Sequence, residues 1–279
     1  MADDPLASVE PRAGVPKPDP ILVVDGVQRR YGGLVAVDVD HLEVQRGVIT
    51  SLIGPNGAGK TTFFNLLCGF DKPDAGRWTF RGDHVEGTSP HVLARKGMVR
   101  TFQLTKTLGR MTVLDNMLLA GRDQRGESAV RGLVRGTWKG QEAELEAKAH
   151  DLLVRFKLDA KAGDYAAGLS GGQRKLLEMA RALMTDPALV MLDEPMAGVN
   201  PALTQSLLGH VTALRDEGMS VLFVEHDMDV IMTISDWVVC MAEGRVIAEG
   251  RPADIAGNAE VIEAYLGIDH GGSVSGEIR

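Results

Sequence analysis

A glycine-rich segment between an apolar run and a helical pattern constrains this chain more than any other feature. Residues 54–61 read Gly-Pro-Asn-Gly-Ala-Gly-Lys-Thr and match the pattern G-x-x-x-x-G-K-[ST]. An apolar run at 48–53 precedes the segment, and a helical pattern at 60–68 follows it and ends at Gly69. A strand, a glycine loop and a helix in this order gather backbone N–H groups and the positive end of a helix dipole around one small concavity. The sequence therefore predicts a site for phosphate groups.

Two side chains of this segment have distinct expected roles. Lys60 would neutralise charge on β- and γ-phosphates, and Thr61 would offer its hydroxyl to Mg²⁺. The alternative, a glycine-rich turn with a surface lysine, does not account for the strand and the helix around it. The residues that we expect to bind the phosphates are Gly54, Pro55, Asn56, Gly57, Ala58, Gly59, Lys60, Thr61 and Thr62.

Acidic and histidine side chains follow two later apolar runs. Asp193 and Glu194 come directly after the run 189–192, and His226 follows the run 221–224. Ligands of open α/β sheets bind at the carboxyl ends of strands, where these side chains would emerge. We expect Asp193 to hold Mg²⁺, directly or through water, and Glu194 to orient and polarise an attacking water as a general base. His226 is expected to reach the terminal phosphate or that water.

A second glycine-bearing helix start lies far along the chain from the first. The residues Leu169, Ser170, Gly171, Gly172 and Gln173 precede a helical pattern at 174–184. A serine and two glycines there supply free N–H groups and a hydroxyl for an anion, although capping of the helix would explain the same residues. One phosphate site needs only one such cradle, so a second indicates contact with another nucleotide. The economical arrangement is two copies of the chain, each completing the site of the other.

The order of patterns along the chain predicts one main domain at 21–267. Apolar strand patterns alternate with helical ones, which is typical of an α/β sheet, and a helical block at about 105–180 interrupts them. Residues 1–20 contain five prolines and no apolar core of a signal peptide, so we expect a disordered leader. Residues 268–279 are rich in Gly and Ser and are expected to form a flexible tail.

Composition excludes several classes of protein. The 30 Lys and Arg against 38 Asp and Glu give a net charge of −8, which argues against a nucleic-acid partner. The two cysteines, Cys68 and Cys240, lie far apart without metal-ligand spacing. The apolar runs are too short to span a membrane, so membrane association is expected only through a partner.

Taken in order, these motifs resemble the ATP-binding cassette family of transporter ATPases over residues 21–267. The resemblance implies an α/β fold: a P-loop NTPase core of the cassette type, with an antiparallel β subdomain and an inserted α-helical subdomain. It implies that Tyr31 stacks on adenine and that Gln103 contacts the nucleotide and Mg²⁺. It also implies that Ser170, Gly171, Gly172 and Gln173 contact the ATP of a second subunit. Lys60, Glu194 and His226 would be the catalytic residues, and Thr61, Gln103 and Asp193 the metal ligands.

A finer resemblance is to the ATPase subunits of bacterial branched-chain amino-acid importers. It rests on residues 100–103, 194–201, 224–228 and 263–267. Asn200 stands where the wider cassette pattern has Asp, which argues against a catalytic role at that position but not against activity.

This resemblance implies a working cycle and a set of partners. Two identical or paralogous cassettes would close around two Mg-ATP and move two transmembrane permease subunits that bind near Gln103 and the helical block. A solute-binding protein would act indirectly, and the chain would lie at the cytoplasmic face of the cell membrane.

Two alternative functions and one question about a surface segment stay open. An exporter cassette of the lipopolysaccharide-transport type shares the Ala-Gly-Val turn at 197–199. A soluble cassette protein outside transport is the second. The locally basic stretch 121–140 is either a solvated loop or a contact with the anionic leaflet.

Overall fold

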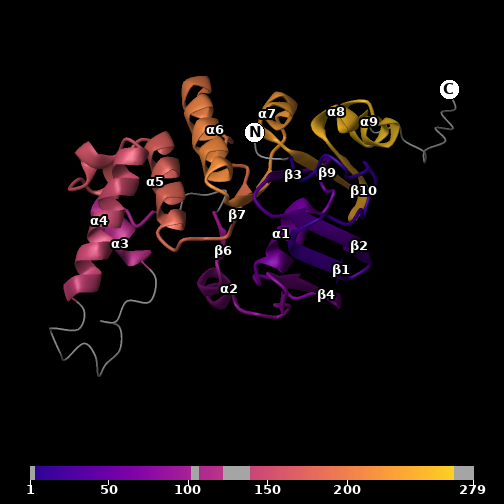
Figure 1. Cartoon of the computed structure of the whole chain (residues 1–279), viewed down its shortest axis with the longest axis horizontal. Coiled ribbons are helices and arrows are strands. Elements are labelled where there is room, and N and C mark those ends of the chain that lie inside the picture. Colours follow the sequence, from indigo (N-terminus) through magenta and orange to yellow (C-terminus); the bar gives the residue numbers. More distant parts are fainter. Residues whose placement is uncertain (1–3, 102–106, 122–138, 267–279) are drawn as a thin grey trace, which may run out of the picture.

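A six-stranded sheet forms the centre of the molecule (Figure 1) in a computed structural model that describes residues 4–101, 107–121 and 139–266. Its strand order is β10-β9-β3-β8-β7-β6, and only β10 runs antiparallel to its neighbour among these pairings. The strands are β3 (Ile49–Ile53), β6 (Met98–Arg100), β7 (Leu189–Asp193), β8 (Ser220–Val224), β9 (Trp237–Ala242) and β10 (Arg245–Gly250). Every residue of β3, β7 and β8 is buried, as expected for parallel strands covered on both faces.

A second, antiparallel sheet has the order β2-β1-β4-β5. Its strands are β1 (Pro20–Tyr31), β2 (Leu34–Gln45), β4 (Ala75–Phe80) and β5 (Asp83–His84). Helix α1 (Lys60–Leu67) packs with both sheets in one core, in which Phe63 of the helix, Trp78 of β4 and Trp237 of β9 are fully buried. This core supports α1 and the glycine loop that precedes it.

Three helices form a block at one end of the molecule (Figure 1). They are α3 (Val113–Leu119), α4 (Lys139–Arg155) and α5 (Gly171–Leu183). Their shared core includes Met117, Leu153 and Leu177, all fully buried. The other helices are α2 (Pro90–Lys96), α6 (Pro201–Asp216), α7 (Met228–Ile234), α8 (Pro252–Ala256) and α9 (Ala259–Leu266). None of the helices in the described part of the chain is long and apolar enough to cross a membrane.

The N-terminal segment differs from the expectation of a disordered leader. Leu6 and Val15 are buried, and the Lys17 Nζ lies 2.6 Å from the Glu249 Oε2, with both side chains almost fully enclosed. The same Oε2 accepts a hydrogen bond from the Trp237 indole at 2.8 Å. Residues 4–19 form turns and no helix or strand, and their few apolar side chains pack against the body of the molecule. Residues 1–3 and the expected tail at 268–279 lie outside the described residues.

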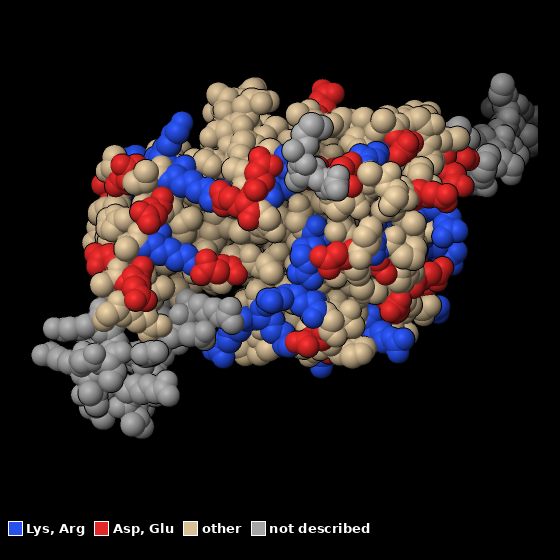
Figure 2. Space-filling model, viewed as in Figure 1, with Lys and Arg blue, Asp and Glu red and all other residues tan. Residues whose placement is uncertain are grey.

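Charged side chains of both signs are interspersed on the face seen in Figure 2. Much of the basic stretch at 121–140 lies outside the described residues, so its expected surface role stays a prediction.

Candidate functional site

The glycine loop lies between β3 and α1, where the sequence places it. Gly54 and Gly59 have φ angles of 146° and 95°, in the region that side chains rarely adopt. A Cβ on Gly54 would lie 2.0 Å from the Met241 carbonyl oxygen, and one on Gly59 would lie 2.2 Å from that of Ala36. Both glycines are therefore required by the close approach of neighbouring strands as well as by the turn itself.

Lys60 reaches back into the loop. Its Nζ donates to the carbonyl oxygens of Gly54 at 2.6 Å and Pro55 at 3.0 Å, and the residue is only 6 % exposed. Burial lowers the pKa of its ammonium, and the negative charge of Glu194 opposes that shift. The ammonium thus lies inside the loop, where it would meet a bound anion.

A cavity of about 340 Å³ opens in front of the loop. It is lined by Tyr31, residues 56–62, Glu194 and His226 together with residues 34–36. Tyr31 is half exposed, its hydroxyl donates to Asp71, and the Arg29 guanidinium lies 4.7 Å from the centre of its ring. The cavity therefore brings together the expected aromatic, phosphate-binding and catalytic side chains.

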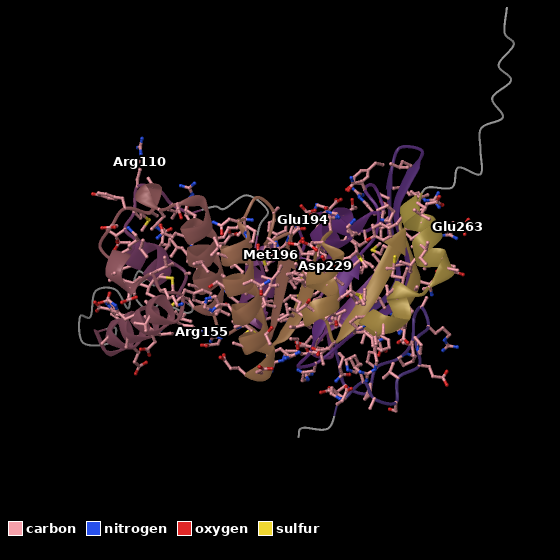
Figure 3. The ribbon with its side chains drawn as sticks, turned by 90° about the horizontal axis from the view of Figure 1, so that it is seen from above. Arg110, Arg155, Glu194, Met196, Asp229 and Glu263 are labelled. Atoms are coloured by element: carbon pink, nitrogen blue, oxygen red, sulfur yellow. The ribbon has the colours of Figure 1, made fainter. Side chains whose placement is uncertain are left out.

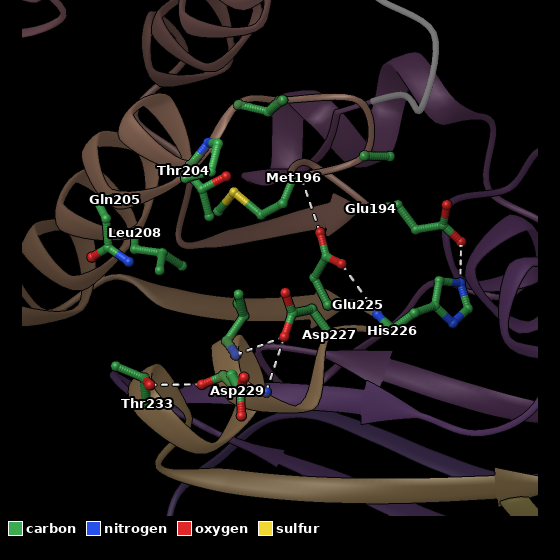
Figure 4. A pocket seen from close by; sticks show the side chains of 14 residues that line it. Glu194, Met196, Thr204, Gln205, Leu208, Glu225, His226, Asp227, Asp229 and Thr233 are labelled. Atoms are coloured by element: carbon green, nitrogen blue, oxygen red, sulfur yellow. Dashed lines mark hydrogen bonds and ion pairs between the residues drawn. The ribbon is translucent and has the colours of Figure 1, made fainter.

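Glu194 and His226 contact each other at the ends of two neighbouring strands. The His226 Nε2 lies 2.5 Å from the Glu194 Oε1 (Figure 4). Glu194 has a φ of 48°, an uncommon left-handed conformation, and its N–H donates to the Val224 carbonyl at 2.9 Å. Strained backbone of this kind is often found at functional sites. Here it turns the carboxylate out of the sheet toward the cavity.

Asp193 is buried beside this pair and is held by a residue that the sequence did not assign to the site. The Arg100 Nη2 donates to the Asp193 Oδ2 at 2.6 Å, and the Arg100 Nη1 donates to the Asn65 Oδ1 at 2.6 Å. The Asp193 Oδ1 is buried and has no hydrogen-bond partner among the described residues. Carboxylate and hydroxyl oxygens are ligands that Mg²⁺ prefers, so the unpartnered Oδ1 of Asp193 fits that ion. Arg100 comes three positions before Gln103, which is the one signal for it in the sequence.

Two residues that the sequence did not assign to the site, Glu225 and Lys175, bind the loop after Glu194. Glu225 accepts hydrogen bonds from the N–H of Met196 at 2.9 Å and of His226 at 3.1 Å (Figure 4). Lys175 of α5 donates to the carbonyl oxygens of Pro195 at 2.8 Å and Ala197 at 2.5 Å. Burial raises the pKa of Glu225 and lowers that of Lys175. The loop thus links the helical block to the segment after β8 that carries His226.

The same loop borders a second cavity of about 540 Å³, shown in Figure 4. Residues of α6 and α7 line its other side, among them Thr204 and Asp229. Seen from above, Glu194, Met196 and Asp229 lie in the middle of the molecule, between the helical block and α9 (Figure 3).

Ser170 caps α5 in the structure. Its hydroxyl oxygen accepts from the Gln173 N–H at 3.2 Å, and the Gln173 side chain accepts from the Ser170 N–H at 3.0 Å. Ser170 and Gly171 are exposed, and the described residues that line the cavity at the glycine loop include none from 169–173. The structure therefore does not bring this helix start to the loop of the same chain. Gln103 lies outside the described residues, so its expected place stays a prediction.

Two family models match the chain. Residues 37–197 match that of the ABC transporter family, and residues 245–271 match that of branched-chain amino acid ATP-binding cassette transporters.

Curated relatives cover nearly the whole chain. A protein of Archaeoglobus fulgidus, described as a probable branched-chain amino acid transport ATP-binding protein, is 44 % identical over 88 % of this chain and 95 % of its own. High-affinity branched-chain amino acid transport ATP-binding proteins of Pseudomonas aeruginosa and Escherichia coli are 42 % and 41 % identical over 89 % of this chain and 98 % of theirs.

Solved structures agree with these matches. An ATP-binding cassette of an ABC transporter in its ADP conformation has a TM-score of 0.77 at 38 % identity, and covers 89 % of this chain and 99 % of its own. A nucleotide-free cassette has a TM-score of 0.75 at 37 % identity, with 88 % and 98 % covered. The predicted fold class is confirmed.

Proposed function

The chain belongs to the ABC transporter family of ATP-binding cassettes, and from this premise we propose that it hydrolyses ATP to drive uptake of branched-chain amino acids or related small polar solutes. The observation that carries the proposal is that one cavity is lined both by Lys60 of the glycine loop and by the Glu194–His226 pair. The names of the relatives favour an importer over an exporter-type cassette and over a soluble cassette outside transport.

The residues of the cavity would have distinct roles in phosphoryl transfer to water. The backbone N–H groups at 54–61 and the Lys60 ammonium would bind the phosphates, and the Tyr31 ring would stack on adenine. Glu194 would orient the attacking water and accept its proton, while the hydrogen bond from His226 holds the carboxylate in place. Mg²⁺, held by Asp193 and Thr61 with Gln103 as a further expected ligand, would neutralise charge on the phosphates. The Lys60 ammonium would supply further positive charge to them.

Two copies of the chain, or this chain and a paralogue, would close around two ATP molecules. The cavity at the glycine loop is lined by none of Ser170, Gly171, Gly172 and Gln173 of the same chain, and a second subunit would supply these groups. The negative phosphates would stabilise the closed pair because only that pair surrounds them with both helix starts.

The surface between β6 and α5 is the proposed contact with the permeases. A cavity of about 380 Å³ opens there, lined by Thr101, Ala120 and Thr185 among others. It lies between the sheet and the helical block, so a bound permease segment would be displaced when the sheet and the block move relative to each other. Two transmembrane subunits bound in this way would place the chain at the cytoplasmic face of the membrane, and a solute-binding protein would act only through them.

Reconstitution tests the function. The chain, its two permease subunits and the cognate solute-binding protein in liposomes should take up labelled leucine, isoleucine or valine only when ATP is present on the side of the chain. Glu194→Gln should keep nucleotide binding and stabilise an ATP-bound dimer, while hydrolysis and uptake stop. Uptake by the Glu194→Gln vesicles at the rate of the unchanged protein would contradict the proposal.

A further inference from the structure

The C-terminal helix reaches the first residue of the glycine loop. The Tyr265 hydroxyl oxygen accepts a hydrogen bond from the N–H of Gly54 at 2.9 Å. Tyr265 lies near the end of α9, within the segment 245–271 that gives the second family match. Gly54 immediately follows β3, so the contact joins two parts of the chain that are far apart in sequence.

Gly54 has little freedom to find another partner for this N–H. The residue is buried, and a Cβ there would lie 2.0 Å from the Met241 carbonyl oxygen, so the neighbouring strand fixes it from one side. A buried N–H without an acceptor is costly, whereas one acceptor removes that cost. The Gly54 carbonyl accepts from Lys60 at 2.6 Å. Tyr265 and Lys60 therefore hold the two polar groups of the residue at which the loop begins.

Helix α9 is well placed to hold Tyr265 in position. At its start, the Asn258 side chain accepts hydrogen bonds from the N–H groups of Glu260 at 2.9 Å and Val261 at 3.1 Å. Val261 is 4 % exposed and packs in a cluster with Ile53, the residue before Gly54. The helix is thus anchored at one end by its cap, along its length by an apolar contact beside the loop, and at the other end by the Tyr265 hydroxyl.

We propose that Tyr265 is a positioning residue for nucleotide binding: it fixes the Gly54 N–H and so preorganises the loop before a phosphate arrives. Binding and docking of α9 are then coupled, and the coupling is reciprocal, so a bound nucleotide stabilises the docked helix. The inference rests on the proposed binding of nucleotide at the loop. It adds a residue of the C-terminal segment that the phosphate-loop pattern does not contain.

The test compares Tyr265→Phe with the unchanged chain. Phenylalanine keeps the ring and removes only the acceptor, so the Kd for Mg-ADP, measured by calorimetry, should rise about threefold to tenfold. The matched control is Tyr165→Phe, which removes the hydroxyl of a tyrosine that is 65 % exposed and lies outside the cavity. Its Kd should stay within twofold of the unchanged value.

Hydrogen exchange separates positioning from simple stabilisation. In the unchanged chain, Mg-ADP should slow exchange of the amides of α9 as well as those of residues 54–61, whereas in Tyr265→Phe it should slow only the loop. A Kd for Tyr265→Phe within twofold of the unchanged value, an equal rise in Tyr165→Phe, or no effect of Mg-ADP on α9 in the unchanged chain would each overturn the inference. Failure of the unchanged chain to bind Mg-ADP would instead overturn the proposed function.

Discussion

Removing Arg100 should destabilise the protein more than removing any exposed arginine. The side chains of Arg100 and Asp193 are only 7 % and 2 % exposed, and their shortest contact is 2.6 Å. Arg100→Leu would leave the Asp193 carboxylate buried without its counter-charge. Breaking a buried pair in this way costs about 3–5 kcal/mol, whereas an exposed pair contributes about 0–1 kcal/mol.

The magnitude can be measured by thermal unfolding in the absence of nucleotide and divalent ions. A loss of about 3 kcal/mol corresponds to a fall in Tm of roughly 6–12 °C for a chain of this size. The control is Arg46→Leu, because Arg46 and its partner Asp19 are 40 % and 60 % exposed. That variant should lose less than about 1 kcal/mol.

A double variant shows whether charge is the cause. In Arg100→Leu/Asp193→Asn no charge is left uncompensated, so much of the lost free energy of unfolding should return. Arg100→Lys keeps the charge but cannot reach Asn65 and Asp193 together, and should fall between the unchanged chain and Arg100→Leu. An Arg100→Leu protein as stable as Arg46→Leu, or a double variant less stable than Arg100→Leu, would refute the reasoning.

Three further changes probe other parts of the structure. Lys60→Ala should abolish binding of Mg-ATP in a calorimetric titration, because the ammonium inside the loop is lost; nucleotide affinity equal to that of the unchanged chain would contradict its role. Burial raises the pKa of Glu225 above its ordinary 4.5, so the folded chain holds this proton more tightly than the unfolded one. Relative to Glu225→Gln, the stability of the unchanged chain should therefore fall as the pH rises from 4.5 through the raised pKa, and a Tm difference independent of pH would refute this. Lys17→Met should lower the free energy of unfolding by about 3 kcal/mol, since it leaves the buried Glu249 carboxylate without its counter-charge. A change in Tm of less than about 2 °C would restore the expectation of a disordered leader.

Local spacing in the sequence was enough to predict the glycine loop and the side chains that follow the buried strands. Residues 54–61 are contiguous, so one pattern defines both the loop and the helix start that follows it. Glu194 and His226 are distant in sequence, yet each follows an apolar run. Because β7 and β8 are parallel neighbours, their carboxyl ends meet and bring the two side chains into contact.

Local patterns of this kind could not predict the residues that act through long-range contacts. Arg100, Lys175, Glu225 and Tyr265 each bind a partner fixed by strand register or helix docking, which no local spacing encodes. The expectation of a disordered leader differs from the structure for a related reason. The five prolines of residues 1–20 predicted disorder, and no local pattern reveals that Lys17 meets a buried carboxylate more than two hundred residues away.

Capping of α5 and contact with a second nucleotide are compatible roles for Ser170. The capping hydrogen bond uses a lone pair of the Ser170 hydroxyl, which accepts from the Gln173 N–H. A serine hydroxyl also carries one hydrogen to donate, and that hydrogen remains available to a phosphate oxygen. Ser170 is exposed, so a group outside the chain can approach this residue. The capping box therefore positions the hydroxyl oxygen within one subunit, and its hydrogen would remain available to an ATP bound, as we propose, on the glycine loop of a second subunit.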